Sequence, residues 1–102
     1  MIPIVADRSV ELESLCQRYS VLRLELFGSA ATGKYRSADS DLDFLVEFKE
    51  LPVRAYGAAY FGLLKSLEQM FGRSVDLVDN SSIKNPYLRE SVDESRVLVY
   101  AA

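Results

Sequence analysis

Three acidic residues have the type and spacing that a metal site requires. Asp41 and Asp43 stand two apart at the start of an apolar run, so on a strand both side chains leave the same face. Asp76 lies within a second apolar run, where an unpaired charge would be costly. Carboxylates that meet on one face of a sheet repel one another unless a cation lies between them, and oxygen ligands suit Mg²⁺ or Mn²⁺. We therefore interpret Asp41, Asp43 and Asp76 as candidate catalytic and metal-binding residues.

A glycine and a serine mark a turn upstream of the first two acids. Gly28 and Ser29 directly follow an apolar run, and Ser29 is expected to cap a short helical run over residues 30–32. The start of a helix presents unpaired backbone N–H groups, which favour an anion and phosphate above all. In the polar loop that follows, Lys34 and Arg36 either supply further positive charge to the phosphates or are ordinary solvated cations.

An anion site beside hard carboxylates suggests that phosphate and a divalent metal are held together. Two such metals can clamp the attacking and leaving oxygens of an in-line displacement at phosphorus. Phosphoryl and nucleotidyl transfer need little beyond positioning and charge neutralisation. The chain has no histidine, which excludes a His-based triad, a His general base and most zinc sites. A single Asp-x-Asp pair is more often a solvated strand end or a turn cap, so the interpretation depends on the combination.

The elements that must position these residues alternate between helix and strand. Apolar residues recur with helical spacing in some stretches and with strand-like spacing in others. The expected order is a helix at 7–19, strands at 22–27 and 42–48, a helix at 53–71, a strand at 74–79, a helix at 86–94 and a strand at 97–100. This order predicts an α/β (α+β) domain with a small mixed β-sheet flanked by helices.

Glycines and an asparagine are expected to shape the two later helices. Gly72 is well placed to end the long helix in a left-handed cap, and Asn85 to cap the last helix ahead of a proline. Gly57 and Gly62 lie inside the long helix, where each costs about 1 kcal/mol relative to alanine. We therefore expect both to allow close packing.

Apolar side chains of two elements are expected to form the core. On the strand that opens with the acids, the residues between them point away from the acids and inward. The aromatic residues of the long helix form a stripe that we also interpret mainly as core. The two sets are Leu42, Phe44 and Val46, and Tyr56, Tyr60, Phe61 and Phe71.

Length, composition and charge set the class of protein. At 102 residues the chain is expected to form one domain spanning residues 1–102. A net charge of −3 gives no general attraction to nucleic acid, so nucleic-acid binding by the chain alone is not expected. No apolar run approaches the roughly 20 residues that span a bilayer, and no signal-peptide pattern is seen. The single Cys16 is expected to be a buried thiol, which agrees with a reducing cytoplasm.

The motifs together resemble a known family. The Gly28-Ser29 pair, the stretch Ser40-Asp41-Leu42-Asp43-Phe44-Leu45-Val46-Glu47-Phe48 and the downstream Val75-Asp76-Leu77-Val78 are similar to those of the nucleotidyltransferase domain of the DNA polymerase β superfamily. More narrowly, the chain resembles the minimal nucleotidyltransferases, the MntA-type antitoxins that are paired with HEPN-domain toxins. The resemblance covers nearly the whole chain and implies a polymerase β-like nucleotidyltransferase fold.

The resemblance also implies a role for each motif residue. Gly28 and Ser29 would hold the triphosphate of ATP, and Asp41 and Asp43 would bind Mg²⁺ or Mn²⁺. Asp76 would help to bind metal and would deprotonate or orient the attacking hydroxyl. Proteins of this group are similar to protein adenylyltransferases, which move AMP from ATP to a tyrosine of the cognate HEPN toxin and so neutralise it. The implied partners are therefore ATP and a toxin that forms a hetero-oligomer with the antitoxin.

Two departures from the family pattern leave alternatives open. Eleven residues separate Ser29 from Asp41, one more than is usual, and Thr32 stands where the family often has arginine. The first alternative is a catalytically degenerate antitoxin that inhibits its toxin by binding alone. The second is a small-molecule or RNA nucleotidyltransferase subunit, which would need a substrate-binding domain for which this length leaves no room.

Overall fold

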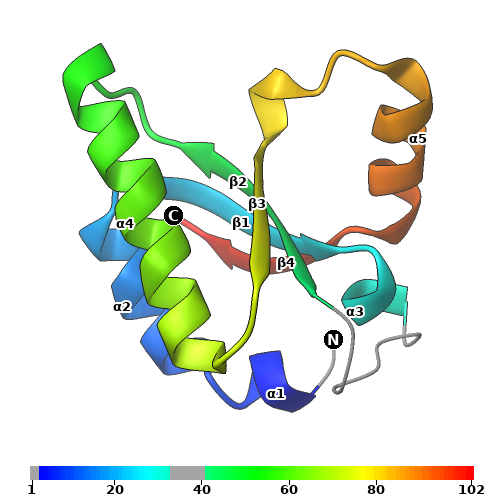
Figure 1. Cartoon of the computed structure of the whole chain (residues 1–102), viewed down its shortest axis with the longest axis horizontal. Helices are drawn as coiled ribbons and strands as arrows, with labels where there is room; N and C mark the ends of the chain where they lie inside the picture. Colours follow the sequence, from blue (N-terminus) through cyan, green and yellow to red (C-terminus); the bar gives the residue numbers. More distant parts are fainter. Residues whose placement is uncertain (1–2, 33–40) are drawn as a thin grey trace.

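A mixed sheet organises the molecule (Figure 1). The computed structural model describes residues 3–32 and 41–102. The four strands are β1 (Val21–Phe27), β2 (Leu42–Phe48), β3 (Val75–Asp79) and β4 (Val97–Ala101), in the order β3-β2-β1-β4. β1 runs antiparallel to both β2 and β4, whereas β2 and β3 are parallel. The expected small mixed sheet is therefore confirmed, with the expected last strand at one edge.

Helices cover both faces of this sheet. The longer ones are α2 (Ser9–Arg18), α4 (Val53–Phe71) and α5 (Pro86–Ser95), and the short ones are α1 (Pro3–Ala6), α3 (Ser29–Thr32) and the 3₁₀ turn η1 (Asn80–Ser82). α2 and α4 lie on one side of the sheet and α5 on the other (Figure 1). Among the described residues, we find no helix with the length and apolar character needed to cross a membrane.

The strand β2 separates the core from the polar face. Leu42, Phe44 and Val46 are all completely buried in one apolar cluster, as expected. Asp43 is half-buried and points to the opposite face. Burying each large apolar side chain contributes roughly 1.5–3 kcal/mol, and a slip of one residue would exchange the two faces. The core therefore fixes the register that presents Asp43.

The long helix α4 connects the two parallel strands and has the predicted bounds. Its buried residues Leu63, Leu67 and Phe71 recur at helical spacing on the face toward the core. Gly72 ends the helix in a left-handed conformation with φ of 64°, and its N–H donates to the Glu68 carbonyl. Asn85 likewise caps α5, because its side chain accepts hydrogen bonds from two backbone N–H groups of the first turn. Both predicted caps are confirmed.

The helix predicted at 7–19 is present as α2, but the short helix α1 that precedes it was not predicted. A turn at Asp7 and Arg8 separates the two helices. Both turn residues donate backbone hydrogen bonds to α1 carbonyls, to Pro3 and Val5 respectively. Cys16 is completely buried as expected, and burial raises the pKa of its thiol to about 12.

The aromatic stripe is less buried than expected. Phe71 is buried, but the Phe61 side chain is 62% exposed, and Tyr56 and Tyr60 are only half-buried. This part of the stripe lies beside β3, which is one of the two edge strands of the sheet. The two tyrosine hydroxyls bond to β3 instead, to the Asp79 carboxylate and the Leu77 carbonyl.

The two glycines inside α4 provide a matched test of this packing. A Cβ at Gly62 would lie 2.4 Å from the Tyr19 ring, whereas a Cβ at Gly57 would meet nothing within 4 Å. The close-packing expectation is therefore confirmed for Gly62 and wrong for Gly57. We predict that Gly57→Ala stabilises the protein by up to about 1 kcal/mol through helix propensity. Gly62→Ala should be less stable than Gly57→Ala by about 1–3 kcal/mol, because the added methyl displaces the ring. Urea unfolding of both variants measures this difference, and equal stabilities would contradict it.

Candidate active site

Two of the three predicted acids lie side by side on the polar face. Asp43 of β2 and Asp76 of β3 are direct partners in the parallel register. Neighbouring strands lie about 4.8 Å apart, so the two carboxyl groups are held next to each other by backbone pairing. A hydrogen bond joins the two side chains. Residues far apart in the sequence thus form one acidic pair.

Asp43 has a raised pKa in this pair. Burial, the hydrogen bond from Asp76 and the charges of Asp76 and Asp41 together raise the pKa of Asp43 to about 6. Asp41 itself is exposed and lies just before β2 begins. Although Asp41 lies outside the strand, its negative charge contributes to the raised pKa of Asp43.

A divalent cation fits this donor set. Carboxylate oxygens are the ligands that Mg²⁺ prefers, and a cation would relieve the repulsion that adds to burial in raising the Asp43 pKa. Within residues 3–32 and 41–102, however, no group of three His, Cys, Asp or Glu side chains is placed to hold a metal ion. The structure thus brings together Asp43 and Asp76 and leaves Asp41 at their margin.

Gly28 packs directly against the acidic pair. Its φ is +72°, a conformation that side chains other than glycine rarely adopt. A Cβ built on Gly28 would lie 2.4 Å from Oδ2 of Asp43. The turn after β1 therefore needs glycine both for its backbone conformation and for its close approach to the carboxylate. The predicted phosphate turn and the predicted metal ligand are in contact.

The short helix α3 begins one residue earlier than expected. Ser29 is its first residue and does not precede it as a cap. The Gly28 carbonyl accepts the first two helical hydrogen bonds, from Ala31 N at 3.1 Å and Thr32 N at 3.2 Å. The N–H groups of Ser29 and Ala30 come before these bonds and are the donors that a helix start offers to an anion. Lys34 and Arg36 lie outside the described residues, so their role stays a prediction.

One residue that contacts this turn, Ser95, was not predicted from the sequence. The Gly28 N–H donates to Oγ of Ser95, at the end of α5, over 3.1 Å. The two residues are 67 positions apart, and a serine in the last turn of a surface helix gives no signal of such a contact. The buried Glu25 on the same face was also missed, and its carboxylate lies 3.6 Å from the Arg96 guanidinium.

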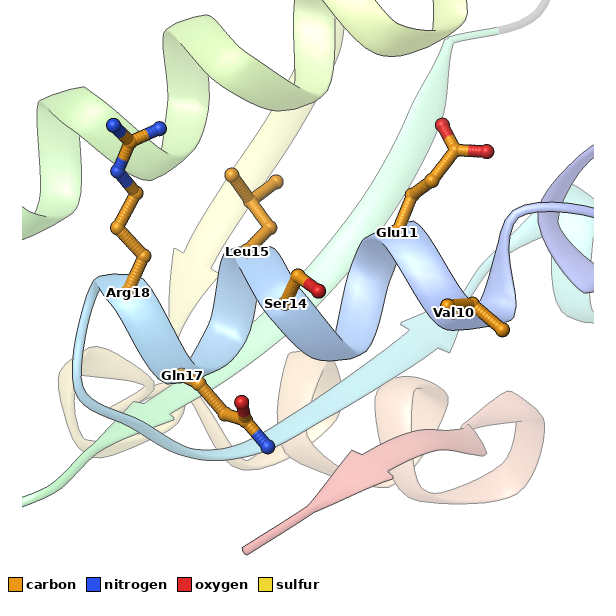
Figure 2. A pocket seen from close by; sticks show the side chains of 6 residues that line it. All are labelled: Val10, Glu11, Ser14, Leu15, Gln17 and Arg18. Atoms are coloured by element: carbon orange, nitrogen blue, oxygen red, sulfur yellow. The ribbon is translucent and has the colours of Figure 1, made fainter.

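A hollow of about 730 Å³ lies away from these residues, on α2 (Figure 2). It is lined by Val10, Glu11, Ser14, Leu15, Gln17 and Arg18. None of the candidate site residues is among them. Because α2 packs on the apolar face of the sheet and Asp43 points to the other face, this hollow and the acidic pair lie on opposite sides of the sheet.

The sequence is similar to those of known nucleotidyltransferases. A family model described as "Nucleotidyltransferase domain" matches residues 11–99. A Methanocaldococcus jannaschii protein named "Putative protein adenylyltransferase MJ1379" is 38% identical over 85 residues, which cover 83% of each chain. "Protein adenylyltransferase MntA" of Thermococcus cleftensis is 37% identical over 73 residues, which cover 72% of this chain and 70% of the relative.

Solved structures share the fold. One described as "Structure of putative minimal nucleotidyltransferase" has a TM-score of 0.71 and 36% identity, and the match covers 91% of this chain and 90% of that one. One described as "Crystal structure of the toxin-antitoxin with AMP-PNP" has a TM-score of 0.67 and 23% identity, over 92% of this chain and 73% of that one. The second likeness is one of fold alone.

The contact between Gly28 and Asp43 predicts the cost of replacing the glycine. Gly28→Ala should destabilise the protein by about 2–4 kcal/mol, from the left-handed backbone and from overlap with the carboxylate. Gly72→Ala is the matched control, since Gly72 also has positive φ but a Cβ there meets nothing within 4 Å. It should lose only about 1 kcal/mol. In denaturant unfolding, Asp43→Ala should recover part of the Gly28→Ala loss, and strictly additive losses would show that the contact is absent.

The unrelieved charge on the acidic pair predicts a stabilising substitution. Asp43→Asn should raise stability near pH 7 by about 1 kcal/mol after allowance for solvent screening, because it removes a carboxylate that is costly to bury and that Asp76 and Asp41 repel. Asp79 gives the contrast. Burial alone raises the pKa of Asp79, but hydrogen bonds from Tyr56 and Ser81 bring it below its ordinary value. Asp79→Ala should therefore lose about 1–2 kcal/mol. Thermal unfolding without divalent metal tests both signs, and a less stable Asp43→Asn variant would contradict the account.

Proposed function

This chain belongs to the nucleotidyltransferase domain family of enzymes, and we propose that it is a metal-dependent protein adenylyltransferase. It transfers AMP from ATP to a tyrosine of a cognate HEPN-domain toxin and thereby neutralises the toxin. The observation that carries the proposal is the pairing of Asp43 with Asp76 against the Gly28 turn. The name of the Thermococcus cleftensis relative supports the choice of AMP and of a protein acceptor.

In this proposal, different residues bind the metal and the phosphates. Asp43 and Asp76, with Asp41 beside them, would hold Mg²⁺ or Mn²⁺. When bound, such a cation neutralises the charge of the triphosphate and of the departing pyrophosphate. The backbone N–H groups of Ser29 and Ala30 donate to the phosphates at the start of α3. Asp43 and Asp76 are register partners, and the Gly28 turn that leads into α3 lies against Asp43.

The reaction is an in-line displacement at the α-phosphorus of ATP. The acceptor hydroxyl oxygen forms the new bond to phosphorus, and the bond from phosphorus to the bridging oxygen of the β-phosphate breaks. Pyrophosphate leaves, and the Asp76 carboxylate takes the proton of the acceptor hydroxyl. Asp76 is suited to this role because it is exposed on the edge strand β3, where an acceptor can approach.

A macromolecular acceptor agrees with the shape of the site. We propose that residues 1–102 form one domain, built on the apolar cluster that packs against the sheet. Asp41 and Asp76 are both exposed, so the partner can complete the site from outside. ATP as substrate and the lone buried Cys16 both suit the cytoplasm, which we propose as its location.

Label transfer tests the proposal directly. The purified chain is incubated with Mg²⁺, a HEPN-domain protein from the same genome and ATP that is labelled on either the α- or the γ-phosphate. We expect label on the HEPN protein from α-labelled ATP only, because adenylyl transfer keeps the α-phosphate and releases the other two. Mass spectrometry of the digested product then locates the modified residue.

One test variant and one matched control variant complete this experiment. Asp76→Asn should reduce transfer at least about 100-fold, as loss of a general base does. Asp79→Asn, a carboxylate change three residues along the same strand, should leave transfer within about twofold, because the amide keeps an acceptor oxygen for Ser81. Transfer from γ-labelled ATP, or toxin inhibition that survives Asp43→Ala and Asp76→Asn together, would overturn the proposal, the latter in favour of inhibition by binding alone.

A further inference from the structure

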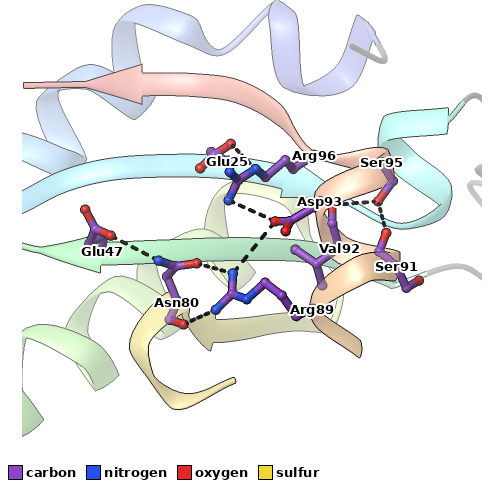
Figure 3. A network of polar contacts seen from close by, with 9 residues as sticks. All are labelled: Glu25, Glu47, Asn80, Arg89, Ser91, Val92, Asp93, Ser95 and Arg96. Carbon is purple, nitrogen blue, oxygen red and sulfur yellow. Dashed lines mark hydrogen bonds and ion pairs between the residues drawn. The ribbon is translucent and has the colours of Figure 1, made fainter. Parts of the chain in front are cut away.

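The hydroxyl of Ser95 connects α5 to the turn beside the acids. Its oxygen accepts the Gly28 N–H at 3.1 Å. Its own proton faces two carbonyls of the same helix, those of Ser91 at 3.3 Å and Val92 at 3.4 Å (Figure 3). Since the helix engages the proton, the hydroxyl presents a lone pair to Gly28. Ser95 is therefore oriented as an acceptor.

Polar contacts hold the N-terminal half of α5 on the sheet. The Arg89 guanidinium donates to both the side-chain and the backbone oxygen of Asn80, each at 2.7 Å. The Asn80 side chain donates in turn to Glu47 of β2 at 3.1 Å (Figure 3). Val92, one turn before Ser95, is 98% buried beneath the helix. These contacts anchor the helix before it reaches Ser95.

Ion pairs hold the C-terminal end of α5. Arg96 lies 3.6 Å from the Glu25 carboxylate and 3.3 Å from that of Asp93 (Figure 3). The Glu25 side chain is only 10% exposed, so this pair is screened less than a surface pair. Ser95 directly precedes Arg96, and its position is therefore set by contacts on both sides. A hydroxyl held in this way is a fixed acceptor for the turn.

We propose that Ser95 is a positioning residue for the nucleotide, an inference that rests on the proposed function. Glycine has more backbone freedom than any other residue, and Gly28 adopts a positive φ. Its N–H is held by a hydrogen bond to Oγ of Ser95. The same N–H is therefore not a phosphate donor. By fixing this peptide, Ser95 orients the next two N–H groups, those of Ser29 and Ala30, toward the phosphates. Gly28 supplies the turn, and Ser95 makes the turn rigid.

Steady-state kinetics separates positioning from chemistry. Ser95→Ala should raise KM for ATP about fivefold to tenfold, the loss that one hydrogen bond of ordinary strength explains. It should leave kcat within about twofold, because the acids are untouched. Ser95→Thr keeps the hydroxyl and should restore KM, whereas Ser91→Ala removes an exposed hydroxyl of the same helix and should behave as the unmodified protein. Ser95→Cys, a close match in size with a weak acceptor, should resemble Ser95→Ala.

Two measurements make the test independent of turnover. The affinity for AMP-PNP with Mg²⁺, measured by calorimetry, should fall in Ser95→Ala by the same factor as KM rises. Amide hydrogen exchange followed by NMR should accelerate at Gly28 in Ser95→Ala and remain slow in Ser91→Ala. Because neither needs a toxin, both remain informative if the acceptor is not the one proposed.

The outcomes distinguish this inference from the proposed function. If the unmodified protein transfers AMP and Ser95→Ala binds AMP-PNP equally well, the positioning role is wrong and the proposed function stands. If no transfer occurs but AMP-PNP binding depends on the Ser95 hydroxyl, the positioning role stands and the proposed acceptor is wrong. Weaker binding in Ser91→Ala by the same factor would also overturn the inference, because it would indicate a general loss of helix packing.

Discussion

The pairing of β2 with β3 is the constraint on which the site depends. Burial of Leu42, Phe44 and Val46 fixes which face of β2 is turned to the core, and the parallel register then sets Asp43 beside Asp76. Burial of Asp43 and the neighbouring charge of Asp76 are both unfavourable for its ionised carboxylate, and both raise its pKa. The apolar cluster offsets this cost, since it buries many large side chains on the other face. The candidate site and the apolar core therefore lie on opposite faces of one strand.

Most of the fold follows from local patterns in the sequence. The bounds of α4, the left-handed cap at Gly72 and the cap at Asn85 depend on residue spacing and backbone chemistry within a few positions, and all three were predicted. The resemblance to minimal nucleotidyltransferases, carried by Gly28-Ser29, the Asp-x-Asp strand and Asp76, is confirmed by the family match and by relatives of similar length. Short motifs were enough to predict the family, and residue periodicity was enough to predict a small mixed sheet.

What sequence reasoning missed depends on contacts between distant parts of the chain. The Ser95 hydroxyl reaches Gly28 across 67 positions, and no local pattern distinguishes it from any serine in a final helical turn. Gly57 and Gly62 look alike in sequence, but only Gly62 faces the Tyr19 ring. Phe61 lies on the apolar stripe of α4, yet it is exposed beside β3, which is an edge strand of the sheet. In each case the deciding fact was which element lies opposite, and this is a property of the assembled fold.

The central claim is that Asp43 and Asp76 share a cation beside the Gly28 turn. A crystal structure of the protein with AMP-PNP and Mn²⁺ tests it most directly, because anomalous scattering locates the metal without ambiguity. The account predicts a metal bound by carboxylate oxygens of both residues, with the triphosphate at the start of α3. A nucleotide bound elsewhere, or a metal that touches neither carboxylate, would contradict it.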